Sequence, residues 1–217
     1  MIDSRVELIS GVGAVIYRQN NPHQVLMTTE KNAKEDSGKL QGQLGFPYET
    51  VEPGESHAQA MDRLLQEEVA VTAGRIAIPH PLESAKLSIV RVSKPEVGAW
   101  LHAYQISATQ DSQFRRGSFD HEVGEPVWVD VRRILATQGT QRVLFKGGTS
   151  EIARAHLAHL ENPHQLRSLI VEKPTELPNW EIYELMKKGF TQIEALSQLG
   201  IDPTPFLRSE VLIHSLK

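Results

Sequence analysis

Two adjacent glutamates, Glu67 and Glu68, have the clearest capacity for chemistry in this chain. They close the segment FPYETVEPGESHAQAMDRLLQEEVA, residues 46 to 70, which also contains Gly54 in a loop. Carboxylates are the hard oxygen ligands that Mg²⁺ and Mn²⁺ prefer, and a glycine-bearing loop leaves room for a phosphate. A cation held there would neutralise a diphosphate, polarise phosphorus and lower the pKa of a bound water. Phosphoanhydride hydrolysis needs all three effects.

The segment has the pattern of a helix that could hold these acids. Apolar residues recur at steps of three and four positions, which fits one buried helical stripe. Pro53-Gly54 is a turn, and Ser56 after it is a natural N-cap. We therefore expect a helix from about Ser56 to about Val71.

On such a helix, residues four positions apart are neighbours. Glu67 then lies beside Arg63, and Glu68 lies beside Leu64. Glu55 precedes Arg63 by eight residues, so the loop could fold back and pair the two. That ion pair would order the loop without taking part in chemistry.

Taken together, these residues resemble the Nudix box, whose usual form is G-x5-E-x7-R-E-U-x-E-E-x-G-U with U an aliphatic residue. The match keeps the spacing without insertion and rests on Glu52, Gly54, Glu55, Arg63, Leu65, Glu67 and Glu68. Resemblance to Nudix hydrolases implies an α/β/α sandwich with a mixed sheet, an α/β (α+β) fold. It also implies a cofactor, Mg²⁺ or Mn²⁺, and water attack on a diphosphate that links a nucleoside to another moiety.

The resemblance also assigns roles. Glu67 and Glu68 match the metal-binding glutamates of the box, and Glu55 and Arg63 match the pair that orders it. Glu125, in EVGEPVWVD, lies where Nudix enzymes often carry a further ligand or base, and Glu122 competes for that role.

Three positions depart from the box: Glu49 and Ala70 replace glycines, and Leu64 replaces a glutamate that commonly binds metal or activates water. Leucine can do neither. In one explanation catalysis survives because Glu49 reaches the metal, or because Glu122 or Glu125 supplies the missing carboxylate. In the other, the protein is a binding module for nucleotides or for another protein. We prefer the hydrolase, a divalent-metal-dependent pyrophosphohydrolase.

The rest of the chain has the elements of such a fold. Residues 12–17 and 25–28 predict a hairpin, residues 31–42 an exposed loop, and residues 88–92, 100–106 and 127–131 further strands. Residues 146–150 lead into a second helix at 150–160, where His156 and His159 are expected at the surface. We divide the chain into a Nudix-like domain, 1–163, and a C-terminal helical extension, 164–217, with helices at 180–188 and 191–199.

Composition narrows the function classes. With no cysteine among 217 residues, disulfides, thiolate zinc sites and cysteine nucleophiles are excluded. No apolar run is long enough to span a membrane, so we expect a cytoplasmic protein with no membrane partner. A net charge of −4 and an extension without basic excess argue against DNA binding. A nucleotide-type small molecule is the expected partner, and the extension could cap the site or form a homodimer contact.

Overall fold

The protein is described here by a computed structural model that covers residues 8–34, 38–93, 98–117, 122–137, 144–163, 169–171 and 179–207. Its main sheet has the strand order β10-β2-β1-β8-β7-β11, with β3 on β2, β4 on β1 and β6 on β8. The bounds of these strands are β1 Leu8–Arg18, β2 Asn21–Thr29, β3 Leu44–Gly45, β4 Tyr48–Thr50, β6 Ile76–Ala77, β7 Lys86–Ser93, β8 Gly98–Ala108, β10 Val127–Asp130 and β11 Leu169–Val171. A separate two-stranded sheet pairs β5 Val69–Ala73 with β9 Gln113–Arg116.

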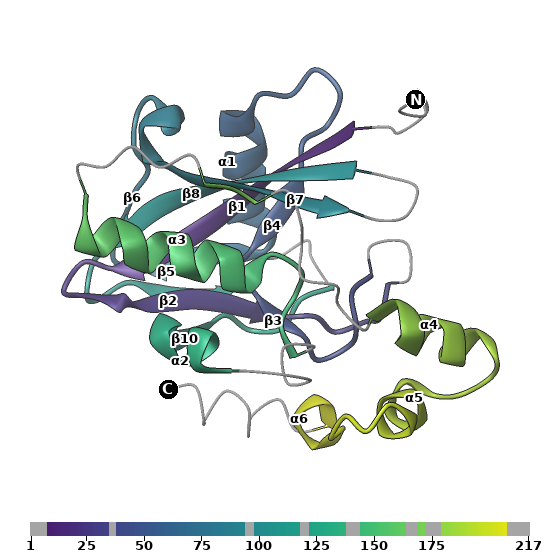
Figure 1. Ribbon diagram of the computed structural model, residues 1–217. Coiled ribbons are helices and arrows are strands. Elements are labelled where there is room, and N and C mark those ends of the chain that lie inside the picture. Colours follow the sequence, from purple (N-terminus) through teal and green to yellow (C-terminus); the bar gives the residue numbers. More distant parts are fainter. Residues whose placement is uncertain are drawn as a thin grey trace.

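The sheet is mixed because β1 runs antiparallel to β2 and parallel to β8. The side chains of β1 are buried on both faces: Val15 belongs to one apolar core, whereas Ala14 and Ile16 belong to a second. A strand covered on both faces is expected in the middle of a sheet. Helices α1 and α3 lie on opposite faces (Figure 1). The predicted α/β/α sandwich is therefore confirmed.

The helices of the sandwich are α1 His57–Glu67, α2 Val131–Ala136 and α3 Thr149–Glu161, and a short 3₁₀ helix, η2, covers Leu82–Ala85. The predicted capping of α1 is present, since the Ser56 hydroxyl accepts from the Gln59 amide and the Gln59 side chain accepts from the Ser56 amide. The predicted hairpin, the strands and the helix at 150–160 are confirmed within a few residues. No helix in the described part of the chain is long and apolar enough to cross a membrane.

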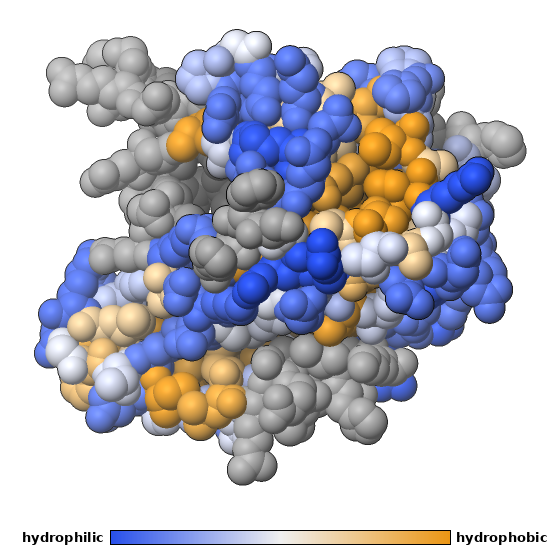
Figure 2. Space-filling view, turned by 180° about the vertical axis from the view of Figure 1, so that it is seen from behind, coloured by the Kyte–Doolittle hydropathy of each residue, from blue (hydrophilic) through white to orange (hydrophobic). Residues whose placement is uncertain are grey.

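Three short helices follow the sandwich: α4 Asn179–Lys187, α5 Gln192–Gln198 and α6 Thr204–Leu207. The predicted stops at Gly189 and Gly200 are confirmed, because both have positive φ, +97° and +70°. These helices gather at one end of the molecule, beside β3 (Figure 1). Seen from behind, their surface includes apolar area (Figure 2). Phe190 and Leu207 are among the exposed large apolar side chains of the described residues.

The expectation of an exposed loop at 31–42 is wrong for its second half. Leu40 and Gly42 are buried, and Leu40 shares one apolar core with Ile182, Leu196 and Phe206 of the C-terminal helices. The sequence around Leu40 is polar and charged, which is typical of an exposed loop. The apolar partners of Leu40 are distant in the sequence, so the contact could not be predicted from local composition. Residues 35–37 lie outside the described part of this loop.

Two further expectations need correction. The first helix ends at Glu67 rather than near Val71, because Val69 and Ala70 pair with Arg116 and Arg115 of β9. His156 is buried rather than at the surface. Its ring contacts the Gln105 side chain and the Pro22 carbonyl, and burial lowers its pKa to about 4.

Candidate functional site

The Glu55 carboxylate orders the loop before α1 by accepting a hydrogen bond from the backbone of that loop. Gly54 has a φ of +83°, which glycine adopts without the steric cost of a side chain. The turn brings the Glu55 amide to the Glu52 carbonyl, 3.0 Å away, and the Glu55 carboxylate accepts from the Glu52 amide at 2.8 Å. Glu55 therefore faces back along the loop, toward α1.

Arg63 is the side chain that ties this loop to the helix. Its guanidinium donates to both carboxylate oxygens of Glu55, at 3.2 and 3.0 Å, and to the Thr50 carbonyl at 2.6 Å. A third nitrogen lies 3.0 Å from Glu49 and 3.8 Å from Glu67. The expected pairing of Glu55 with Arg63 is present. The hydrogen bonds from Arg63 lower the pKa of Glu55, and those bonds in turn raise the pKa of Arg63.

Leu64 follows Arg63 in α1 but faces the core rather than this network. It is fully buried and packs in the apolar core with Ala60, Met61 and Leu65. A carboxylate at this position would enter that core, so the replacement of glutamate by leucine is part of how the helix packs. This position offers no oxygen ligand to the site.

Glu67 and Glu68 end the helix in different surroundings. The Glu67 side chain is 37% exposed, whereas Glu68 is 5% exposed. The Glu68 carbonyl accepts from the Gly117 amide at 3.4 Å, which joins the end of α1 to the segment after β9. Ala70, expected near the helix end, is instead the second residue of β5.

The other two candidate acids are bound elsewhere. Glu125 accepts from the Arg116 amide at 3.0 Å, so it is attached to β9. Glu122 forms an ion pair with Lys34. Neither contacts Arg63, whereas Glu49 does, and Glu49 also accepts from the Thr50 amide at 2.8 Å.

A buried ion cluster that sequence reasoning missed lies next to this region. Glu30, at the end of β2, has a 1% exposed side chain and contacts Lys39 at 3.3 Å and the equally buried Lys146. Burial alone would raise the pKa of Glu30, but the charges of Lys146 and Lys39 outweigh it and lower that pKa. One feature of the sequence could have indicated the buried acid: Glu30 directly follows the strand segment VLMTT.

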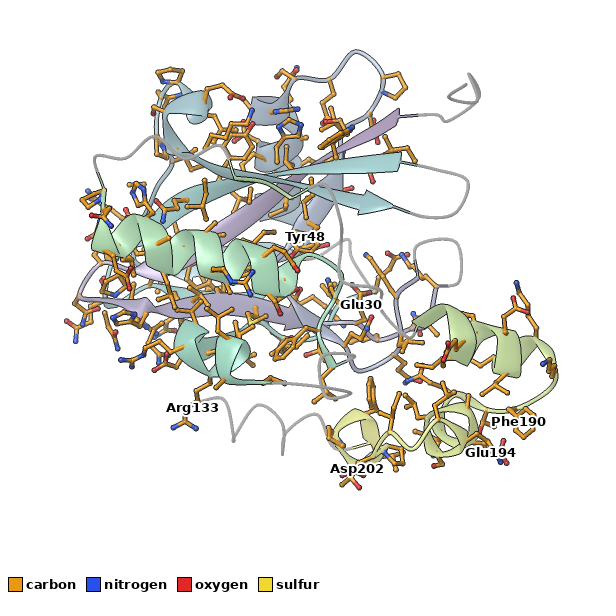
Figure 3. All side chains as sticks on the ribbon, viewed as in Figure 1. Glu30, Tyr48, Arg133, Phe190, Glu194 and Asp202 are labelled. Carbon is orange, nitrogen blue, oxygen red and sulfur yellow. The ribbon has the colours of Figure 1, made fainter. Side chains whose placement is uncertain are left out.

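Tyr48, the first residue of β4, lies beside this cluster. Its ring lies against Gly13, where an added Cβ would come within 2.9 Å of it, and its hydroxyl is 3.4 Å from the Thr149 hydroxyl. The Lys146 ammonium lies 5.7 Å from the ring centre, a cation–π distance. Figure 3 shows Tyr48 and Glu30 near one another, between α3 and α4.

These carboxylates do not form a metal cage. Across the described ranges, no three histidine, cysteine, aspartate or glutamate side chains are grouped closely enough to hold a metal ion. The candidate oxygen ligands are Glu49 and Glu67, which share Arg63 as their cation, and Glu68, whose negative charge acts on Lys39. Hence the present arrangement does not fit Mg²⁺ or Mn²⁺.

Gly117 controls how closely β9 approaches the end of α1. A Cβ built on Gly117 would overlap the Glu67 carbonyl group. Gly117→Ala is expected to displace this end of the helix and to lower the free energy of unfolding by about 1–3 kcal/mol. Urea denaturation would measure the loss. Gly124→Ala is the control, since its Cβ would meet Thr29 at an ordinary 3.5 Å; equal losses in the two variants would contradict the prediction.

A family model described as the NUDIX domain matches residues 8–145 of the chain. No curated protein matches the chain. Among solved structures, the chain is similar to the E. coli ORF135 protein, at 20% identity and a TM-score of 0.51, over 74% of this chain and 96% of that one. It is also similar to the MutT protein from Methanosarcina mazei Go1, at 16% identity and a TM-score of 0.52, over 74% of this chain and 98% of that one. A C. elegans Ap4A hydrolase in a binary complex matches at 17% identity and a TM-score of 0.50, over 70% and 98% of the two chains. At these identities the likeness is one of fold.

Proposed function

This chain belongs to the Nudix hydrolase family, and from that premise we propose that its Nudix domain binds a nucleoside diphosphate derivative without efficiently hydrolysing it. The observation that carries the proposal is the position of Leu64, fully buried where the box usually has a carboxylate. The fold and the ordered loop support binding, because the ion pair of Arg63 with Glu55 is kept.

The three possible substitutes for the missing carboxylate also support this choice. Glu49 is 3.0 Å from Arg63, Glu122 is paired with Lys34, and Glu125 accepts from the Arg116 amide. Each of them already has a cation or a backbone donor as its partner. To take over the role of the lost glutamate, any of them would have to leave that partner.

A metal-dependent pyrophosphohydrolase is the second candidate. It is favoured by the Glu67 carboxylate, which is 37% exposed and only 3.8 Å from Arg63, a loose contact. A bound Mg²⁺ or Mn²⁺ would supply an activated water. Glu67, Glu68 and Glu49 are the residues proposed to hold it, and Glu49 and Glu67 would then have to turn away from Arg63.

One panel of ligands separates the two candidates. Nucleotide sugars, ADP-ribose, dinucleoside polyphosphates, nucleoside triphosphates and capped RNA would each be added with EDTA or with Mn²⁺. Calorimetry would measure binding, and phosphorus NMR would measure cleavage. We expect at least one ligand to bind in EDTA and to stay intact.

Binding of no member would overturn the proposal. Turnover with Mn²⁺ that a Glu67→Gln/Glu68→Gln variant loses would establish the second candidate instead. Glu184→Gln is the control for this variant, because Glu184 is an exposed acid of α4 whose ion pair with Lys187, at 3.2 Å, lies at the surface.

A further inference from the structure

The loop that carries Lys39 is held by the C-terminal helices. The Tyr183 hydroxyl of α4 donates to the Lys39 carbonyl. The Gln192 side chain of α5 accepts from the Gln41 amide at 3.0 Å and donates to the Gln41 carbonyl at 2.9 Å. These bonds fix the backbone on both sides of Leu40, which is itself in the shared apolar core.

The side chain of Lys39 extends from this loop into the group of acids. Its ammonium is 3.3 Å from Glu30, and the side chain is only 25% exposed. Burial alone would lower the pKa of Lys39, but the negative charges of Glu30, Glu68 and Glu122 raise it. Lys39 is therefore a cation at neutral pH, in contact with Glu30 and attracted by the charges of Glu68 and Glu122.

The cluster already has its own positive charges. Lys146 pairs with Glu30, Lys34 pairs with Glu122, and Lys39 lies within the field of Glu68. Like charges repel each other, and the repulsion grows as burial lowers the effective dielectric constant. A divalent ion beside Glu68 would thus be repelled by the Lys39 ammonium, whose backbone the C-terminal helices hold next to Glu30.

We propose that Lys39 is a built-in cation of the Nudix site, positioned by α4 and α5, which supplies the positive charge that a divalent ion would otherwise bring. In this role Lys39 compensates the negative charge of the acids around it and does not take part in bond cleavage. The C-terminal helices are then part of the ligand site, because they hold the loop that carries the charge. The inference deepens the proposed function and rests on it in one respect: it explains ligand binding without added metal.

Mn²⁺ alone is the probe, with free Mn²⁺ measured by electron paramagnetic resonance. The variant Lys39→Met removes the charge and leaves Lys146 to compensate Glu30. It is expected to bind Mn²⁺ about tenfold more tightly than the unaltered protein. Lys39→Arg, which keeps the charge, and Lys188→Met, which removes a charge at the exposed end of α4, are the matched controls and are expected to show no change.

Two results would overturn the inference. One is unchanged Mn²⁺ affinity in Lys39→Met. The other is a gain in affinity that persists after Glu68→Gln is added to Lys39→Met, because the new metal would then lie elsewhere.

The double variant Tyr183→Phe/Gln192→Ala tests the helices and also serves if Lys39→Met does not fold. It keeps Lys39 but removes three hydrogen bonds that hold its loop. We expect a smaller rise in Mn²⁺ affinity, and no rise would refute the positioning role of α4 and α5. These Mn²⁺ titrations contain no nucleotide. They therefore test the role of Lys39 separately from the ligand panel, which tests whether the protein binds nucleotides.

Discussion

Replacing Leu64 with glutamate is expected to lower the free energy of unfolding by about 4 kcal/mol or more and to produce no hydrolase. Leu64 is fully buried: it packs among Ala60, Met61 and Leu65 in the core beneath α1. The variant loses a buried apolar side chain and places a carboxylate where no cation is available. Leu64→Glu brings back the glutamate that the Nudix box usually has at this position. The substitution would nevertheless destabilise the helix that carries Glu67 and Glu68.

The measurement is urea denaturation followed by circular dichroism, with Leu64→Met as the matched control. Methionine conserves volume, so this control is expected to cost less than about 1.5 kcal/mol. The phosphorus NMR assay with Mn²⁺ would be run on both variants. A Leu64→Glu protein that is as stable as the control and cleaves a nucleotide would contradict both the packing argument and the proposed function.

Glu30→Gln is expected to destabilise the protein by about 3–5 kcal/mol, because it removes the shared partner of the buried Lys146 and the partly exposed Lys39. The side chains of Glu30 and Lys146 are 1% and 2% exposed. Glutamine has the same shape but no charge, so the Lys146 and Lys39 ammonium groups would lose their main compensation. Glu184→Gln, at a pair in which Glu184 is 65% exposed, is expected to cost less than about 1 kcal/mol.

The same ion cluster makes stability depend on pH. The pKa of Glu30 is lowered from 4.5 in the folded protein. Its contribution is therefore fully present above about pH 4.5 and is lost as the pH falls through the lowered value. Between pH 7 and pH 3 the free energy of unfolding of the unaltered protein should fall more steeply than that of Glu30→Gln; parallel curves would argue against the charged cluster.

Local patterns predicted most of what is local in this structure. The turn at Gly54, the cap at Ser56 and the apolar stripe of α1 each depend on residues within a few positions, and all are present. The Glu55 pairing with Arg63 was predictable for the same reason, since a turn and two helical turns separate them. The spacing of the Nudix-box residues was therefore enough to predict both the fold and the geometry of the loop before α1.

What the sequence could not predict depends on distant partners. The helix ends early because β5 pairs with β9, more than forty residues away. Lys146 follows Glu30 by more than a hundred residues, and nothing in KGGTS indicates that its lysine will be buried beside an acid. Leu40 is buried by the C-terminal helices. The sequence pattern of those helices does not indicate that they pack against this loop.

The parallel pairing of β1 with β8 has a consequence for how the chain is made. β1 can pair with β2 as soon as residues 8–29 have been synthesised, but its other edge waits for β8, which begins at Gly98. Pairing between such distant segments forms slowly, because a long loop must close first. On the ribosome, one edge of an apolar strand therefore stays open until the residues between Thr29 and Gly98, and then β8 itself, have been added. During that interval a chaperone, or a second nascent chain, has access to the strand that later becomes the centre of the sheet.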